Sequence, residues 1–210
     1  MKKIIFCAIL IIFAFNSFAQ NGRNGPSLWE EIRNNSFLEY DNSKPQIIDA
    51  LKKYDSHQYL INRLSKNGQR YLFYTVSEAL KRDLPVELSL IPFIESQFDP
   101  YAQSSTGASG IWQFIPSTAL ENGLKKNWWY DARRDIVAST NAAYNFLIKL
   151  NEEHDDWLIA IAAYNAGPSR VRKEIRKNKE KGLPTDFWSL NLPKETRAYV
   201  PKILALAEVI

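Results

Sequence analysis

A single carboxylate in an otherwise apolar segment is the first candidate for chemistry. Residues 88–98 read Leu-Ser-Leu-Ile-Pro-Phe-Ile-Glu-Ser-Gln-Phe, so Glu95 is the one charged side chain in the run. An acidic group is rarely buried without a partner, and an apolar wall raises the pKa of a carboxyl by disfavouring its charged form. Such a group donates a proton near neutral pH, as the acid of a glycosidase must. The alternative is that Glu95 lies at the polar edge of its helix.

The following segment, residues 102–114, changes from small and polar to aromatic and amide side chains, and reads Ala-Gln-Ser-Ser-Thr-Gly-Ala-Ser-Gly-Ile-Trp-Gln-Phe. Glycines let a backbone come close to a ligand. The amide of Gln113 can both donate to and accept from an N-acetyl group. The indole of Trp112 can stack on a sugar ring or belong to the core. This segment favours a cleft beside Glu95 over a polar helix edge.

Helical signals continue through most of the chain, and Val- or Thr-rich alternating runs are absent from the sequence. Pro92 should kink its helix just before Glu95. No repeat, long linker or low-complexity segment divides residues 45–210, so they predict one helical domain. We expect helices at 45–54, from Ser56 to an end at Gly68, and at 71–82, 85–99, 116–124, 135–150, 157–166 and 194–210, the last interrupted by Pro201.

The first nineteen residues predict a secretory signal peptide. Lys2 and Lys3 precede an apolar run at 4–15 that is short for a membrane span, and Ser17-Phe18-Ala19 offers small residues for cleavage before Gln20. An uncleaved anchor helix is the alternative. Export would place the protein in the periplasm or cell envelope. Residues 20–44 are expected to form a flexible mature N-terminus.

The cysteine and histidine pattern predicts no metal site. Cys7 is the one cysteine of the chain and lies inside the apolar run, too early to be a lipoprotein attachment site at the cleavage point. A mature chain without it holds no disulfide and no thiolate ligand. His57 and His154 do not form a ligand cluster, so we expect no metal.

The charge balance is mild, with a formal net charge of +4 over 210 residues. A basic run can contact an anionic polymer, but it is more often the solvated face of a helix, which we favour here. Basic side chains do not alternate with aromatic ones, so we expect no nucleic-acid partner. The run consists of Arg170, Arg172, Lys173, Arg176, Lys177, Lys179 and Lys181.

Four motifs appear in order: Glu95-Ser96, Gly-Ala-Ser-Gly-Ile-Trp-Gln at 107–113, Ala-Tyr-Asn-Ala-Gly at 163–167, and Glu-Thr-Arg-Ala-Tyr-Val at 195–200. Together they resemble the soluble-lytic-transglycosylase domain of glycoside hydrolase family 23, over roughly residues 45–202. The Trp before Gln113 and the Glu-Thr-Arg block are similar to the branch called membrane-bound lytic murein transglycosylase D. The resemblance implies an all-α, lysozyme-like fold of the goose type with additional N-terminal helices.

The resemblance also implies the site residues, with Glu95 as the catalytic acid and base. Gln113 matches the glutamine that contacts the N-acetyl group, and Tyr164 and Asn165 match a cleft pair. Tyr199 matches a late tyrosine that reaches back towards the acid. Ser104 matches a serine that hydrogen-bonds near the reactive end of the substrate. Each has a structural alternative: a turn for that serine, a helix end for the asparagine and core packing for the tyrosines. The implied substrate-binding set is Ser96, Ser104, Trp112, Gln113, Tyr164, Asn165 and Tyr199.

The activity implied is that of a peptidoglycan lytic transglycosylase. One carboxyl would perform both proton transfers on the bond between N-acetylmuramic acid and N-acetylglucosamine, and the product would carry a 1,6-anhydro end, without a cofactor. Asp99 is four residues after Glu95, but it precedes Pro100, so we interpret it as a cap or turn residue. Ile111 departs from the usual Leu of the family, which does not affect the chemistry.

Two alternatives stay open from the sequence. A hydrolytic muramidase on the same fold would release reducing ends, and a non-catalytic glycan-binding domain would keep the cleft without an acid. The expected partner is the peptidoglycan glycan strand. A monomer is expected, with peripheral association with the envelope as a further expectation.

Overall fold

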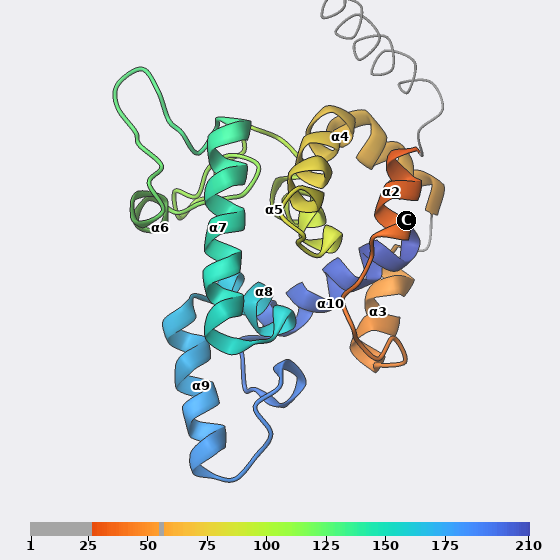
Figure 1. Ribbon diagram of the computed structural model, residues 1–210, viewed down its shortest axis with the longest axis vertical. Coiled ribbons are helices and arrows are strands. Elements are labelled where there is room, and N and C mark those ends of the chain that lie inside the picture. Colours follow the sequence, from red (N-terminus) through yellow and green to blue (C-terminus); the bar gives the residue numbers. More distant parts are fainter. Residues whose placement is uncertain (1–26, 55–56) are drawn as a thin grey trace, which may run out of the picture.

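The computed structural model describes residues 27–54 and 57–210, and for residues 57–67 it describes the backbone only. Over these ranges the regular elements are helical, and β-pairing is confined to isolated bridges (Figure 1). This confirms the all-α expectation for the described part of the chain. The helices are α2 (Leu28–Asn34), α3 (Pro45–Lys53), α4 (His57–Leu80), the 3-10 helix η2 (Val86–Leu90), α5 (Ile91–Ser96), α6 (Pro116–Glu121), α7 (Ile136–His154), α8 (Trp157–Ala166), α9 (Pro168–Glu180), the 3-10 helix η3 (Phe187–Ser189) and α10 (Lys194–Val209).

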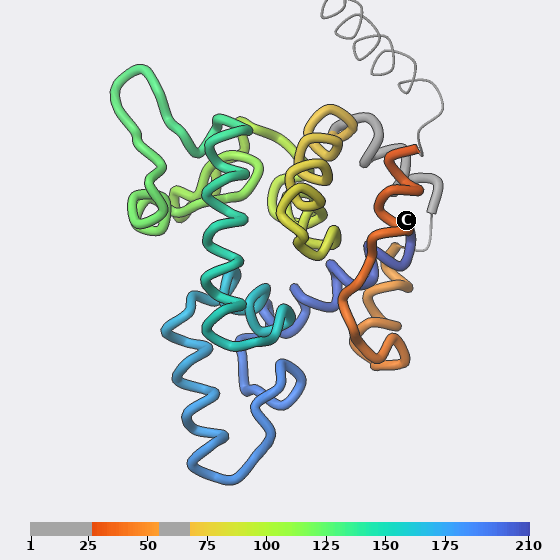
Figure 2. Tube along the Cα trace, in the orientation of Figure 1, coloured from red at the N-terminus to blue at the C-terminus, as the bar shows by residue number. Residues whose placement is uncertain are grey.

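Helix α8 forms the centre of the fold, because its sequence is apolar on nearly all sides. Residues 158–163 are all buried, as expected for a helix without a polar face. Asp156 caps α8 by accepting from the amides of Leu158 and Ile159. Helices α7 and α10 pack against α8, and α10 then continues past α3 (Figure 2). Pro201 lies inside α10 without interrupting it, contrary to our expectation.

Helix α4 is continuous through Gly68, so the prediction that this glycine ends a helix is wrong. A Cβ atom at Gly68 would lie 2.7 Å from Cδ2 of Phe98, which is buried. The glycine therefore allows α4 and the chain after α5 to approach closely. Its role is packing, which overrides its preference for a helix end.

Pro92 predicted one kinked α-helix around Glu95. The structure instead has two short helices there. The 3-10 helix η2 changes to α5, and Pro92 lies in the first turn of α5, where its missing N–H has no partner to lose. Gln97 ends α5 in the left-handed conformation, with φ of 55°. Asp99 accepts from the amide of Tyr101 at 2.9 Å, which confirms it as a turn residue. Glu95 thus lies in the last turn of a helix fixed at both ends.

The segment expected to form a flexible mature N-terminus, residues 20–44, contains a helix and several long-range contacts. Ser27 begins α2 with a capping box, and Ile32 of that helix is buried. The segment after α2 is held by Glu87, a buried carboxylate whose Oε1 accepts from Ser36 Oγ at 2.6 Å and from the amide of Phe37 at 2.9 Å. Residues 36–38 thus supply hydrogen-bond donors to a buried carboxyl group, which is costly to bury without partners. The expected signal peptide, Cys7, residues 20–26 and Ser56 lie outside the described residues.

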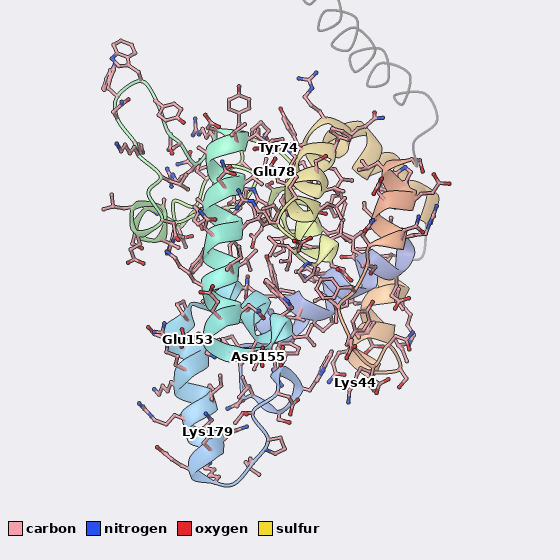
Figure 3. The ribbon with its side chains drawn as sticks, viewed as in Figure 1. Lys44, Tyr74, Glu78, Glu153, Asp155 and Lys179 are labelled. Atoms are coloured by element: carbon pink, nitrogen blue, oxygen red, sulfur yellow. The ribbon has the colours of Figure 1, made fainter. Side chains whose placement is uncertain are left out.

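The basic run falls largely on α9 and forms a solvated face, as favoured from the sequence. Most of its side chains, Lys179 among them, are exposed (Figure 3). Arg172 pairs with Glu153 of α7, and surface pairs of this kind add little to stability. Within residues 27–54 and 57–210, none of the helices has the length and apolar character needed to cross a membrane.

Candidate active site

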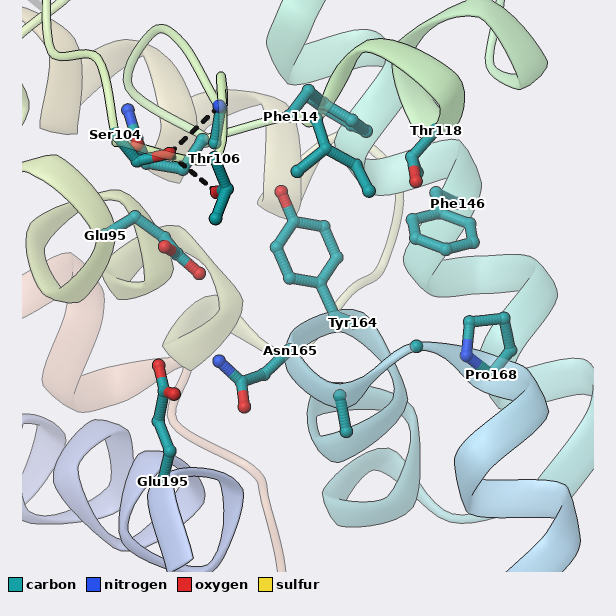
Figure 4. A pocket seen from close by; sticks show the side chains of 15 residues that line it. Glu95, Ser104, Thr106, Phe114, Thr118, Phe146, Tyr164, Asn165, Pro168 and Glu195 are labelled. Carbon is teal, nitrogen blue, oxygen red and sulfur yellow. Dashed lines mark hydrogen bonds between the residues drawn. The ribbon is translucent and has the colours of Figure 1, made fainter. Parts of the chain in front are cut away.

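A cleft opens beside Glu95 where four parts of the chain meet. It lies between α5, the loop that leads into α6, the end of α8 and the beginning of α10, with one side chain from α7 (Figure 4). The cleft therefore needs the tertiary structure, since α8 and α10 are far in sequence from α5 and the loop that follows it. Its lining includes Glu95, Ser104, Thr106, Gln113, Phe114, Phe146, Tyr164, Asn165 and Glu195.

The carboxyl of Glu95 is largely shielded from solvent at the wall of the cleft. Burial raises the pKa of Glu95 from its ordinary value of 4.5 to about 7. The hydroxyl of Tyr199 donates to Oε1 of Glu95 at 2.5 Å, and this bond lowers the pKa, whereas the nearby charge of Glu195 raises it. Burial is the largest of the three influences, so the group is poised to give and take a proton near neutral pH.

Tyr199 is buried and Tyr164 is partly buried, and the hydroxyl of each has a defined acceptor. Burial raises the pKa of each phenol well above its usual value of 10, so each hydroxyl stays protonated and donates. Tyr199 donates to Glu95, which is where the resemblance places it. Tyr164 donates to the carbonyl oxygen of Trp112 at 2.7 Å while its ring lines the cleft. Tyr164 therefore holds the loop to α8, in addition to forming part of the wall.

The amide of Asn165 has a fixed orientation at the end of α8. Thr196, buried at the beginning of α10, donates from Oγ1 to Oδ1 of Asn165 at 2.8 Å. With the oxygen satisfied there, the amide nitrogen is the group left to face the cleft, and it lies on the side of Glu95 (Figure 4). Gly167, with φ of 87°, caps the end of α8 two residues after Asn165. The helix end and the cleft contact are therefore not alternatives for Asn165, because it serves as both.

The loop at 102–114 presents Gln113 and Ser104 to the cleft. Gln113 has φ of 49°, and its Nε2 donates to the carbonyl oxygens of Gly110 at 2.8 Å and Ala102 at 3.2 Å. Both donors are used inside the loop, so Oε1 is the group that can accept from a ligand. Ser104 Oγ accepts from the amide of Ala108 at 3.0 Å, which makes it a turn residue that also lines the cleft.

This loop is built onto the segment before α7. A Cβ atom at Gly110 would lie 1.8 Å from the carbonyl oxygen of Arg133, and Gly110 has φ of 82°, so both space and backbone require glycine. Arg133 Nη1 donates to the carbonyl oxygens of Gly107 at 2.7 Å and Phe114 at 3.2 Å. Asp131 pairs with the guanidinium at 2.6 Å. Arg133 was not anticipated, because nothing in its local sequence indicates which loop it contacts.

Three residues of the expected substrate-binding set do not line the cleft: Tyr199, which is buried against Glu95, and also Trp112 and Ser96. The indole of Trp112 is fully buried and donates to Thr140 Oγ1 at 3.0 Å, so its ring cannot stack on a sugar. Its contribution is the backbone carbonyl that accepts from Tyr164. Ser96 does not line the cleft; its hydroxyl lies 3.1 Å from the carbonyl oxygen of Pro92 and 2.9 Å from that of Ile111. Ser96 thus joins α5 to the loop.

The sequence reasoning missed Glu195 and Thr196. Glu195 lines the cleft and acts electrostatically on Glu95, and Thr196 orients Asn165. Glu195 lies four residues before Tyr199, a spacing that places both on one face of a helix. That spacing, within a motif already identified, was the signal for Glu195. No local pattern indicates the partner of Thr196.

The chain is similar to a known protein family and to several known proteins. The family model described as "Transglycosylase SLT domain" matches residues 75–186. The chain is 47% identical over 166 residues to "Membrane-bound lytic murein transglycosylase D" of Escherichia coli, which covers 79% of this chain and 37% of that protein. It is 44% identical over 124 residues to "Putative tributyltin chloride resistance protein" of an Alteromonas species, which covers 59% of this chain and 60% of that protein.

A third relative is more distant. "Putative soluble lytic murein transglycosylase" of Haemophilus influenzae is 34% identical over 116 residues, which covers 53% of this chain and 19% of that protein. The chain thus spans little more than a third of the length of the Escherichia coli relative and less of this one.

Proposed function

This chain belongs to the transglycosylase SLT domain family, which has a lysozyme-like all-α fold, and from that premise we propose that it is a peptidoglycan lytic transglycosylase. The proposed reaction cleaves the β-1,4 bond between N-acetylmuramic acid and N-acetylglucosamine and leaves a 1,6-anhydro muramic end. The resemblance noted from the four motifs, including that to the D branch, is confirmed.

The observation that carries the proposal is the state of Glu95. Its carboxyl lies at the wall of the cleft, and burial raises its pKa to about 7. A carboxyl with this pKa is protonated often enough to act as an acid, and ionised often enough to act as a base, at the same pH. One residue can therefore serve both steps of the proposed reaction.

In the first step, Glu95 gives its proton to the oxygen that links the two sugars, and the bond from that oxygen to the anomeric carbon breaks. The muramic N-acetyl group, or a short-lived oxocarbenium ion, holds the anomeric carbon, in the manner of substrate-assisted glycosidases. In the second step, the ionised Glu95 takes the proton of the 6-hydroxyl on the same sugar, and that oxygen closes onto the anomeric carbon. The hydrogen bond from Tyr199 stabilises the carboxylate between the steps.

Gln113 and Asn165 are the proposed contacts of the N-acetyl groups. The free acceptor of Gln113 suits an amide N–H, and the amide nitrogen of Asn165 suits a carbonyl oxygen. Ser104 and Tyr164 complete this wall. The proposal keeps these residues as substrate contacts and treats Ser96 and Trp112 as parts of the framework.

The test is Glu95→Gln, assayed by release of soluble muropeptides from purified sacculi. General acid catalysis contributes about a hundredfold or more, so turnover should fall at least that far while the variant still sediments with sacculi. The matched control is Glu180→Gln on the exposed surface of α9, which should keep wild-type turnover. Residual activity above about a hundredth of wild type would show that another group is the acid.

The competing function is a hydrolytic muramidase, and Glu195 is the observation that favours it. A second carboxylate in a cleft can activate a water molecule as a base, and Glu195 lines this one. The two functions differ in their products by one water molecule. Mass spectrometry of the digest decides between them: anhydro-muropeptides support the transglycosylase, and reducing muropeptides alone would replace it with the muramidase.

Three wider expectations belong to the same proposal. Residues 1–19 are proposed to be a signal peptide, so that the folded part acts in the periplasm or envelope. Residues 45–210 are proposed as the catalytic domain, with the ordered segment from Ser27 packed onto it. The proposed partner is the glycan strand, with the protein acting as a monomer. N-terminal sequencing of the exported protein tests the cleavage before Gln20.

A further inference from the structure

A second hollow lies away from the cleft, on the loop that joins α6 to α7. Figure 1 shows this loop projecting beyond the helices on either side of it. The hollow is formed by residues 126–131 and 134–136 together with Tyr71 of α4 and the turn at 100–101, and it shares no lining residue with the cleft of Glu95. Five aromatic side chains line it: Tyr71, Tyr101, Trp128, Trp129 and Tyr130. We refer to it as the aromatic hollow.

Four of the five rings of the aromatic hollow are exposed to solvent, and Tyr71 packs against the core. Trp128 is 87% exposed, Trp129 is 89% exposed and Tyr101 is 74% exposed. Large exposed apolar groups gathered in one place mark an interaction surface. The two indoles are nearly perpendicular, at 88° with centroids 6.1 Å apart, so they offer a corner with two faces. Neither ring contributes to the core, so the fold itself gives no reason for them.

The backbone of this loop is held in place. Asn127 Oδ1 accepts from the amides of Trp129 at 2.9 Å and Tyr130 at 2.8 Å, and the hydroxyl of Tyr130 donates to Asp135 at 2.9 Å. The residues that display the rings are therefore fixed by hydrogen bonds at the tip and at the base. A preorganised surface binds a ligand with less ordering cost than a loose loop.

We propose that the aromatic hollow is a second binding site for the glycan strand, outside the catalytic cleft. The faces of the aromatic rings suit the apolar faces of amino sugars. Charged side chains of both signs line the hollow beside the rings, including Lys126, Asp131 and Arg134. This mixture fits a ligand rich in hydroxyl and amide groups. A surface that enters a bilayer pairs its aromatic groups mainly with basic ones, whereas Asp131 and Asp135 lie in this hollow. The identity of the ligand rests on the proposed function.

The aromatic hollow is physically joined to the loop that forms the cleft. Arg134, which lines the hollow, donates from Nε to Ser109 Oγ at 3.2 Å. Its neighbour Arg133 bonds the carbonyl oxygens of Gly107 and Phe114 in the same loop. Two contacts on one rigid body hold a polymer more tightly than either alone, provided that the strand reaches both. The hollow would thus retain a long strand while the cleft acts on it.

The test measures binding without turnover. In the Glu95→Gln background, purified sacculi are titrated with protein and sedimented, and the double substitution of Trp128 and Trp129 to Ala is compared with Leu120→Ala. Leu120 is 75% exposed on α6 and lies outside both hollows, so it is a matched loss of exposed apolar surface. We expect the double variant to bind sacculi about tenfold more weakly, a size usual for central aromatic contacts, and Leu120→Ala to bind as the parent does.

The possible results distinguish a glycan-binding site from a membrane-binding surface. Equal binding by the double variant and the parent overturns the proposal. Loss of binding to phosphatidylglycerol vesicles, with sacculus binding intact, also overturns it and assigns the hollow to a membrane surface. The Tm of the double variant reports its folding, and Tyr101→Ala, on a separate turn, repeats the test if that variant does not fold. If the protein binds sacculi through the aromatic hollow but the wild type releases no anhydro-muropeptides, the second binding site is supported. Only the proposed function is then refuted.

Discussion

The raised pKa of Glu95 makes a prediction about stability that does not depend on any substrate. Between the ordinary pKa of 4.5 and the folded value of about 7, the folded protein keeps a proton that the unfolded chain has lost. The free energy of unfolding therefore falls as the pH rises through this window and is level above it. One pKa unit corresponds to about 1.4 kcal/mol, so the ionised carboxyl costs the folded state about 3 kcal/mol at pH 8.

Glu95→Gln removes this cost, because the amide is neutral at every pH and its oxygen can still accept from Tyr199. The variant should match the wild type at about pH 4 and exceed its free energy of unfolding by about 3 kcal/mol at about pH 8. Urea denaturation followed by circular dichroism at several pH values measures the difference. Glu180→Gln, at an exposed surface pair, should change stability by less than about 1 kcal/mol throughout. A difference between Glu95→Gln and wild type that stayed constant within about 1 kcal/mol across the range would refute the argument from burial.

Three further predictions concern the residues around the acid. Glu195→Gln removes a negative charge that raises the pKa of Glu95, so the alkaline limb of the pH–rate profile should move to lower pH; an unmoved limb would show that the charge does not act on the acid. Thr196→Val leaves Oδ1 of Asn165 without its donor and should lower kcat/KM on muropeptides about tenfold. Thr196→Ser keeps the hydroxyl donor and should retain wild-type kcat/KM. Equal losses in both variants would show that Thr196 acts through packing and not through this hydrogen bond. Gly110→Ala should lower the free energy of unfolding by about 2 kcal/mol or more in urea denaturation, because both its positive φ and the adjacent carbonyl oxygen exclude a side chain; a smaller loss would mean that the neighbouring loop can move aside.

The helices were predictable where a local signal was strong. Pro45 and Asp156 begin helices where the sequence places them, and Gly167 ends one. The same reasoning failed at Gly68, where a ring 30 residues away decides the matter, and it did not anticipate the hydrogen bonds that join residues 36–38 to Glu87. In both places the deciding contact is long-range, and no local pattern encodes it.

The site divides in the same way. Glu95, Gln113 and Tyr199 were predicted because each stands in a distinctive motif, and the structure places Glu95 and Gln113 at one cleft and Tyr199 against the carboxyl of Glu95. Trp112 was placed in the substrate-binding set with core packing as the alternative, and burial shows that its ring belongs to the core. Thr196 was passed over because a threonine has no chemistry of its own here and gains its part only from the amide opposite.

The sequence by itself determined the helical class and the family and singled out Glu95 as the candidate acid, because these depend on periodicity and on motifs read along the chain. Only the tertiary structure decided how acidic Glu95 is, which way Asn165 faces and where exposed rings such as Trp128 gather. The physical reason is that a pKa, an amide orientation and an exposed surface are properties of the groups that surround a residue. Folding brings those groups together from distant parts of the chain.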